Sequence, residues 1–201
     1  MINTITQKGR AMELDRTYRR SAEYWKATVQ GASGDWSAPT PCADWDLRTL
    51  VNHVVGEDRW TKSLVDGKTI ADVGDAFDGD LLGDDPKSAA IAAADEALNA
   101  VAERLPGGGK VHLSYGEEDI EEYVRQLVAE HLIHGWDVAV ATGQQRTLDP
   151  ELAAAVAAWF RDREDMYRSG RSIAARPDTA TGGDPQADLL IAFGRNPDWA
   201  P

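Results

Sequence analysis

Hydrophobic residues recur at three- and four-residue spacing in several long stretches of the chain, and this pattern predicts amphipathic helices. The first helix is predicted over residues 14–29, with its apolar face made of Leu14, Tyr18, Ala22, Trp25 and Val29. A break that contains glycine and proline follows, and either Asp44 or Asp46 stands where it can cap a second helix. The apolar positions of that second helix are Leu47, Leu50, Val51, Val54 and Val55.

Three further helices are predicted in the second half of the chain. One covers residues 86–105, because a proline opens its first turn and the run PGGG at 106–109 stops it. The next covers residues 117–142, with acidic residues in its first turn and Gly143 at its end. The last begins after an Asp-Pro pair and covers residues 150–168.

The segments between these helices lack the helical spacing of apolar residues. Residues 66–85 are rich in Asp and Gly and predict a long solvated loop, and KVHLSYG at 110–116 alternates as an extended segment does. The whole pattern predicts an all-α fold, a four-helix bundle in a single domain over 1–201. We expect the bundle at 14–168 and a C-terminal tail at 169–201 that packs on it.

The charge and cysteine content exclude several classes of protein. The chain has 34 acidic against 21 basic residues and a net charge of −13, which disfavours nucleic acid or an anionic membrane as a partner. Cys42 is the only cysteine, so no disulfide can form within the chain. No secretory signal and no stretch of 18 apolar residues is present. We therefore expect a cytoplasmic protein. Its expected partner is a small-molecule substrate, and its expected state is a monomer or homodimer.

Three residues on two predicted helices form a candidate metal site. Glu130 and His134 are four residues apart, which places both on one face of a helix about one turn apart. His53, on the second predicted helix, is the expected third ligand. Two imidazoles and one carboxylate leave a coordination position open, as in catalytic zinc sites, and Ni2+ or Fe2+ accepts the same donors. His131 points about 100° away from Glu130 but is spaced to pair with His134 instead, and the sequence leaves that choice open.

Each of these residues also has an interpretation without a metal. A helix-face histidine is often satisfied by a carbonyl or by solvent, and an acid such as Glu57, four residues after His53, is either a further ligand, a general base or simply solvated. Asp137 is placed either to orient a ligand through a hydrogen bond or to make a salt bridge between helices. Cys42 has neither a base nor a positive charge beside it in the sequence, so it is expected to be a small buried hydrophobic residue.

The sequence around these residues resembles that of a known family. The first signature of the DinB-like superfamily resembles TPCADWDLRTLVNHVVG, and the second resembles EHLIHGWDVAVATGQ. The resemblance is to the actinobacterial branch in particular, which is typified by the N-terminal domain of mycothiol-dependent maleylpyruvate isomerase. VHLSYG and LLIAFGRNP are also similar to this branch, so the resemblance extends over residues 14–197. It implies an up-and-down four-helix bundle with His53, Glu130 and His134 as metal ligands and His131 outside the set.

The resemblance also implies a function. We expect a Zn2+-dependent enzyme that uses mycothiol or another low-molecular-weight thiol in transfer or isomerisation, because metal coordination favours the nucleophilic thiolate. The isomerase has a C-terminal domain that contributes to its active site, whereas only residues 169–201 follow the last long helix here, so maleylpyruvate isomerisation itself is not expected. A metal-dependent hydrolase and a non-catalytic metal-binding protein are the alternatives.

Three residues near these signatures are candidates for binding the cofactor. Trp45 and Trp136 stand in the two signatures and either line the cleft or pack in the core. Arg195, in FGRNP, either folds back as an anion-binding group or stays on the surface and pairs with Asp188 or Asp198.

Overall fold

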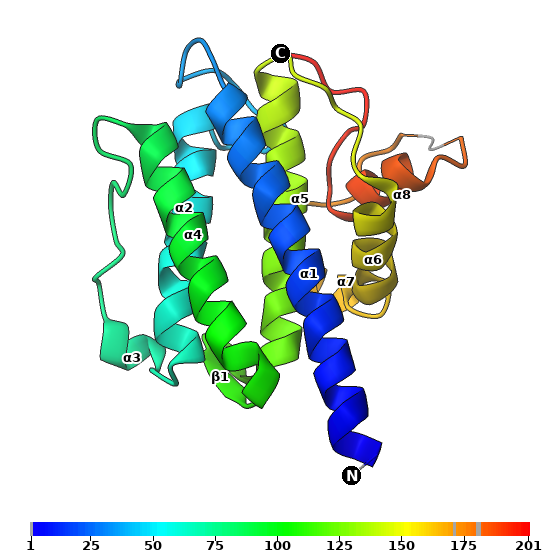
Figure 1. Ribbon diagram of the computed structural model, residues 1–201. Coiled ribbons are helices and arrows are strands. Elements are labelled where there is room, and N and C mark those ends of the chain that lie inside the picture. The colour runs from blue at the N-terminus through cyan, green and yellow to red at the C-terminus, as the bar shows by residue number, and fades with distance from the viewer. Residues whose placement is uncertain (1, 171, 180–181) are drawn as a thin grey trace.

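Four long helices dominate the computed structural model, which describes residues 2–170, 172–179 and 182–201. They are α1 (Ile2–Gly31), α2 (Leu47–Val65), α4 (Pro86–Arg104) and α5 (Ile120–Ala141). Helix α1 packs against α4 and α5, and α2 packs against the same two helices from the other side (Figure 1). The prediction of a mainly helical protein is therefore confirmed.

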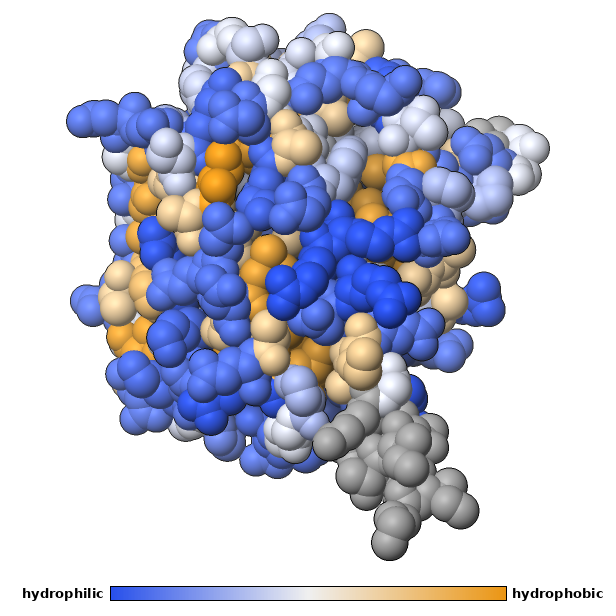
Figure 2. Space-filling model, viewed as in Figure 1, coloured by the Kyte–Doolittle hydropathy of each residue, from blue (hydrophilic) through white to orange (hydrophobic). Residues whose placement is uncertain are grey.

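The predicted apolar faces of the first two helices form the core. All ten positions are buried, namely Leu14, Tyr18, Ala22, Trp25 and Val29 on α1 and Leu47, Leu50, Val51, Val54 and Val55 on α2. Each large apolar side chain buried in this way contributes roughly 1.5–3 kcal/mol. The face of the molecule seen in Figure 2 is mostly hydrophilic, with small separate hydrophobic areas.

Local hydrogen bonds fix the first turns of α2 and α4. The Asp46 carboxylate accepts a hydrogen bond from the backbone N–H of Thr49 at 2.7 Å, so Asp46 rather than Asp44 caps α2. Asp85 caps α4 in the same way through Ser88, and Pro86 occupies the first turn. A 3-10 turn, η1 (Leu105–Gly107), ends that helix.

The extended segment before α5 is a hairpin, and the predicted start of α5 was wrong by three residues. Strand β1 (Lys110–Leu113) pairs antiparallel with β2 (Gly116–Asp119), and His112 stands opposite Glu117. The acids at 117–119, which resemble a first helical turn in the sequence, are held in this ladder instead. Helix α5 therefore begins at Ile120.

Other boundaries also differ from the prediction. Helix α1 begins at Ile2 rather than Leu14, and the acidic segment 66–85 contains a short helix, α3 (Ile70–Val73), stabilised by a capping box. The last predicted helix is divided into α6 (Pro150–Phe160) and α7 (Glu164–Ser169). The turn between them brings Tyr167 back onto the rings of Trp159 and Phe160, with centroids 5.9 and 5.7 Å apart.

The C-terminal segment contains α8 (Pro185–Ala192), which contacts α6. Leu190 is completely buried, and Phe193 stacks on Phe160 with ring centroids 4.0 Å apart. These contacts attach the segment after α8 to the same hydrophobic cluster that contains the apolar face of α5. Among the described residues, no helix combines the length and the apolar character needed to cross a membrane.

Gly194 directly follows Phe193, and we expect this position to tolerate no side chain. Its φ is +77°, and a Cβ atom there would lie 2.8 Å from the carbonyl oxygen of Ala174. Gly194→Ala should therefore lower the free energy of unfolding by about 2–3 kcal/mol in urea titrations. Gly143→Ala is the matched control, since its φ is +71° but nothing lies within 4 Å, and it should lose only about 1 kcal/mol. Equal losses in the two variants would contradict this account of the close contact.

Candidate metal centre

Helices α2 and α5 bring three potential metal ligands together. Glu130 and His134 stand one turn apart on α5, and the Nε2 atom of His134 lies 3.1 Å from Oε2 of Glu130. His53 reaches the same carboxylate oxygen from α2, with its Nε2 atom 3.3 Å away. The ligand atoms of all three residues lie within 4.8 Å of one another. The structure thus brings together the three side chains that the sequence predicts to be neighbours.

The three side chains face an open cavity rather than the solid core. The side chains of His53 and Glu130 are 30% and 34% exposed, and that of His134 is 9% exposed. The cavity measures about 670 Å³, and its walls come from the loop before α2, from α2 and α5, and from the segment after α8. An additional ligand can therefore approach the donor atoms from the cavity.

The chemistry and spacing of the donors fit a divalent transition metal. In a tetrahedral site with bonds of about 2.1 Å, donor atoms lie about 3.4 Å apart. The two imidazole nitrogens lie 3.1 and 3.3 Å from Oε2 of Glu130, close to that value. Burial tends to raise the pKa of Glu130, but hydrogen bonds from His134 and His53 outweigh it and hold that pKa well below its usual range. The carboxylate is therefore charged at neutral pH, as a ligand must be.

The second nitrogen of His134 is held by a buried carboxylate. Its Nδ1 atom lies 3.0 Å from Oδ2 of Asp137, which is fully buried. Burial by itself lowers the pKa of His134, but Asp137, Cys42 and Glu130 together raise it well above its ordinary value. Any metal that binds at Nε2 must therefore displace a proton, so its binding is coupled to proton release.

Arg195 folds back into this network and lines the cavity, so the alternative of a surface arginine is wrong. Its side chain is buried, and its Nη2 atom donates to Oδ2 of Asp137 at 2.9 Å and to Sγ of Cys42 at 2.8 Å. It pairs with neither Asp188 nor Asp198, and Asp137 already neutralises its charge. The prediction that Cys42 is simply a small buried hydrophobic residue is wrong, because it is only half-buried and accepts a hydrogen bond from an arginine 153 positions away in the sequence.

The two tryptophans of the signatures have different environments. Trp45 packs on both imidazoles, with ring centroids 4.7 Å from His53 and 6.0 Å from His134, and it lines the cavity. Trp136 is completely buried in the hydrophobic core and does not line the cavity. The expectation of a cofactor contact at Trp136 is thus corrected. The reason is helical geometry, because residues two positions apart point about 200° apart.

His131 stands on another face of α5, away from the three donors. Its Nε2 atom lies 3.0 Å from Oδ1 of Asp58, and both side chains are only 1% exposed. Its ring stacks on Tyr18 and Trp25 of α1, with centroids 5.5 and 6.2 Å apart. The alternative pairing of His131 with His134 is therefore not formed.

Glu57 also lies on the cavity wall, as its spacing from His53 allows. Burial, followed by the negative charge of Glu130, raises the pKa of Glu57 to about 7. A carboxyl group of this kind can hold a proton or give it up near neutral pH. Glu57 does not belong to the group of three donors that lie within reach of one ion.

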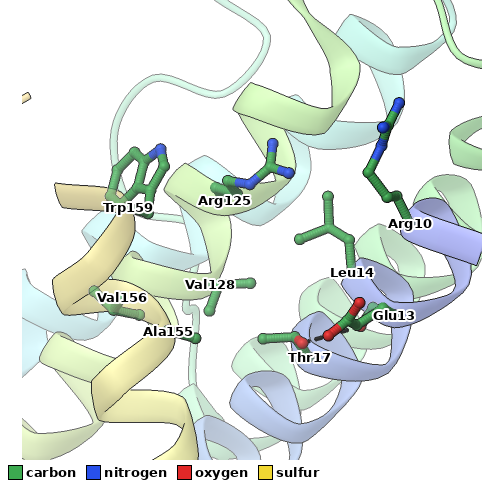
Figure 3. A pocket seen from close by; sticks show the side chains of 9 residues that line it. All are labelled: Arg10, Glu13, Leu14, Thr17, Arg125, Val128, Ala155, Val156 and Trp159. Atoms are coloured by element: carbon green, nitrogen blue, oxygen red, sulfur yellow. Dashed lines mark hydrogen bonds between the residues drawn. The ribbon is translucent and has the colours of Figure 1, made fainter. Parts of the chain in front are cut away.

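A second hollow lies between α1, α5 and α6 (Figure 3). It measures about 230 Å³ and is lined by Arg10, Glu13, Leu14, Thr17, Arg125, Val128, Ala155, Val156 and Trp159. These residues include one carboxylate and no histidine or cysteine. The hollow therefore offers no donor set for a transition metal.

Comparison with known proteins links this geometry to one family. The model of the mycothiol maleylpyruvate isomerase N-terminal domain matches residues 18–139, which include all three donors. Two relatives are the uncharacterized proteins Rv0738 and MT0763 of two strains of Mycobacterium tuberculosis. Each is 30% identical over 146 residues, which cover 68% of this chain and 71% of the relative. No solved structure gives a significant match.

Proposed function

This chain belongs to the mycothiol maleylpyruvate isomerase N-terminal domain family, and on that premise we propose that it is a metal-dependent enzyme that uses a low-molecular-weight thiol, such as mycothiol, to transfer or isomerise a small molecule. The proposal includes an up-and-down four-helix bundle of the DinB-like type, formed by α1, α2, α4 and α5. The observation that carries it is the convergence of His53, Glu130 and His134 on one point at the edge of a cavity.

His53, Glu130 and His134 would hold the metal, and Zn2+ suits this set of two nitrogens and one carboxylate oxygen. Ni2+ and Fe2+ remain alternatives for the same donors. When bound, such a metal favours the thiolate form of a thiol at neutral pH. The protein offers three donors, so a four-coordinate metal held by them would keep one position for the thiol.

The residues around the donors have separate tasks in this proposal. Trp45 covers one side of both imidazoles and restricts their rotation. Glu57, on the wall of the same cavity, is a candidate acceptor for the proton that the thiol loses. A cavity of about 670 Å³ lies within the range of small-molecule sites, and Tyr115, Tyr123 and Tyr167 give its wall aromatic surface for a substrate.

Spectroscopy of the Co2+-substituted protein tests this proposal directly. Addition of a small thiol should produce a sulfur-to-cobalt charge-transfer band in the near ultraviolet, because the thiolate enters the open position. Cys42→Ser should show the same band, which excludes the thiol of the protein itself as its source. His53→Ala should show no band at the same metal concentration.

Two other results would point to the alternative functions. Co2+ binding with no thiolate band, together with metal-dependent cleavage of esters or amides, would favour a hydrolase. Protein that takes up no metal from a chelator-free buffer would contradict the metal-dependent enzyme altogether.

A further inference from the structure

We propose that Arg195 is a positioning residue of the metal centre, and that its guanidinium fills a second donor set made by Cys42, Asp137 and Nδ1 of His134. By filling that set it keeps His134 turned with Nε2 toward His53 and Glu130. This inference rests on the proposed metal site. It adds that Arg195 decides which ring nitrogen of His134 faces the metal.

His134 stands between two groups of donors, one at each ring nitrogen. Its Nε2 atom faces Glu130 at 3.1 Å, and its Nδ1 atom faces Oδ2 of Asp137 at 3.0 Å. An imidazole that donates its Nδ1–H to a carboxylate has its Nε2 lone pair available for a metal. The position and charge of Asp137 therefore determine which nitrogen is the ligand.

The group at Nδ1 could itself hold a metal. Cys42, His134 and Asp137 offer sulfur, nitrogen and oxygen atoms that all lie within 4.8 Å of one another. A thiolate, an imidazole and a carboxylate form a donor set that Zn2+ and Co2+ accept. This set shares His134 with the first one, so a metal there would compete with the proposed site.

A cation of the protein already occupies that second set. Arg195 donates from Nη2 to Cys42 Sγ at 2.8 Å and to Asp137 Oδ2 at 2.9 Å, and from Nε to Asp137 Oδ1 at 3.2 Å. A guanidinium cannot lose its proton in a protein, so this charge is permanent. The arginine therefore neutralises Asp137 and excludes a metal ion from the sulfur.

The packing of the C-terminal segment also holds Arg195 in position. Its backbone N–H donates to the carbonyl oxygen of Leu190 at 2.8 Å, and its Nη1 donates to that of Phe193 at 2.8 Å. Phe193 in turn stacks on Phe160 of α6. The guanidinium is thus held in place before any metal arrives.

Loss of the guanidinium should have two measurable consequences. The buried Asp137 would lose its positive partner, so His134 would no longer be held in one orientation. The second donor set would also become free to bind a metal through Cys42. Metal affinity at the first set should fall while a thiolate-ligated metal appears.

Arg195→Met tests this, since it removes the charge and keeps much of the side-chain volume. In competition with a metal buffer, the variant should bind Co2+ at the first set about 10- to 100-fold more weakly than the wild type. Without any added thiol, it should also show a sulfur-to-cobalt charge-transfer band. That band should vanish in the double variant Cys42→Ser, Arg195→Met.

Arg146→Met is the matched control. Arg146 donates to the carbonyl oxygens of Pro197 and Trp199 and so holds the same C-terminal segment without touching the donors. It should leave both Co2+ affinity and spectrum unchanged. Wild-type affinity and no thiolate band in a folded Arg195→Met protein would overturn the inference, as would equal effects in the two arginine variants.

The wild-type protein gives a second test that does not depend on the stability of a variant. In metal-loaded protein with 15N-labelled histidine, long-range NMR correlations should place a proton on Nδ1 of His134. A proton on Nε2 would overturn the inference even where the metal binds. Loss of Co2+ binding in His53→Ala reports separately on the proposed site, and wild-type protein that binds no Co2+ through His53 would overturn both.

Discussion

His134→Ala is expected to weaken metal binding by more than about 100-fold. Loss of a residue that only supports a ligand typically costs 10- to 100-fold in metal affinity, and removal of a ligand should cost more. His134 supplies one of the three donors of the proposed site and also joins them to Asp137. Metal content after dialysis against a metal buffer, together with calorimetric titration, would measure the loss.

His112→Ala provides a control of the same residue type. The side chain of His112 on β1 is 42% exposed, and it lies 3.9 Å from the carboxylate of Glu117. That variant should retain the metal content of the wild type. Equal metal content in wild type and His134→Ala would refute the ligand assignment, whatever the activity of either protein.

His131→Ala should lower the free energy of unfolding by about 3–5 kcal/mol. The variant leaves the carboxylate of Asp58 buried without its partner, and loss of one member of a buried pair typically costs this much. It also removes a ring that stacks on Tyr18 in the core. Since domains are stable by only about 5–15 kcal/mol, the loss should be evident as a fall of roughly 10 °C in Tm and as an earlier urea midpoint.

The double variant Asp58→Leu, His131→Phe separates the cost of the lone carboxylate from the cost of an altered core. It removes both polar groups and fills the space with apolar atoms, so it should be more stable than His131→Ala. A double variant that is no more stable would contradict the explanation by an unpaired charge. Metal affinity, measured on the folded fraction of His131→Ala, should stay near that of the wild type.

The sequence by itself determined the features that depend on local geometry. The period of the apolar residues predicted which faces of α1 and α2 are buried, because side chains three and four positions apart share a face of any helix. The same rule predicted that Glu130 and His134 would stand together. It also separated His131 from Glu130, although it could not say which of the two would join His134.

Only the tertiary structure decided the contacts between distant segments. The acids at 117–119 suit the first turn of a helix, but pairing with β1 holds them in a strand. Helical spacing separates Trp136 from His134, but packing decided which of their two faces of α5 meets the cavity.

The environment of Cys42 is the clearest case of contacts that the sequence alone does not reveal. Its neighbours in the sequence offer neither a base nor a positive charge, whereas the fold brings it to His134, Asp137 and Arg195. Burial of the segment after α8 causes that meeting, and no local pattern reports it. The spacing of residues along a helix is fixed by hydrogen bonds between near neighbours, but the meeting of separate elements depends on how all the apolar faces pack together.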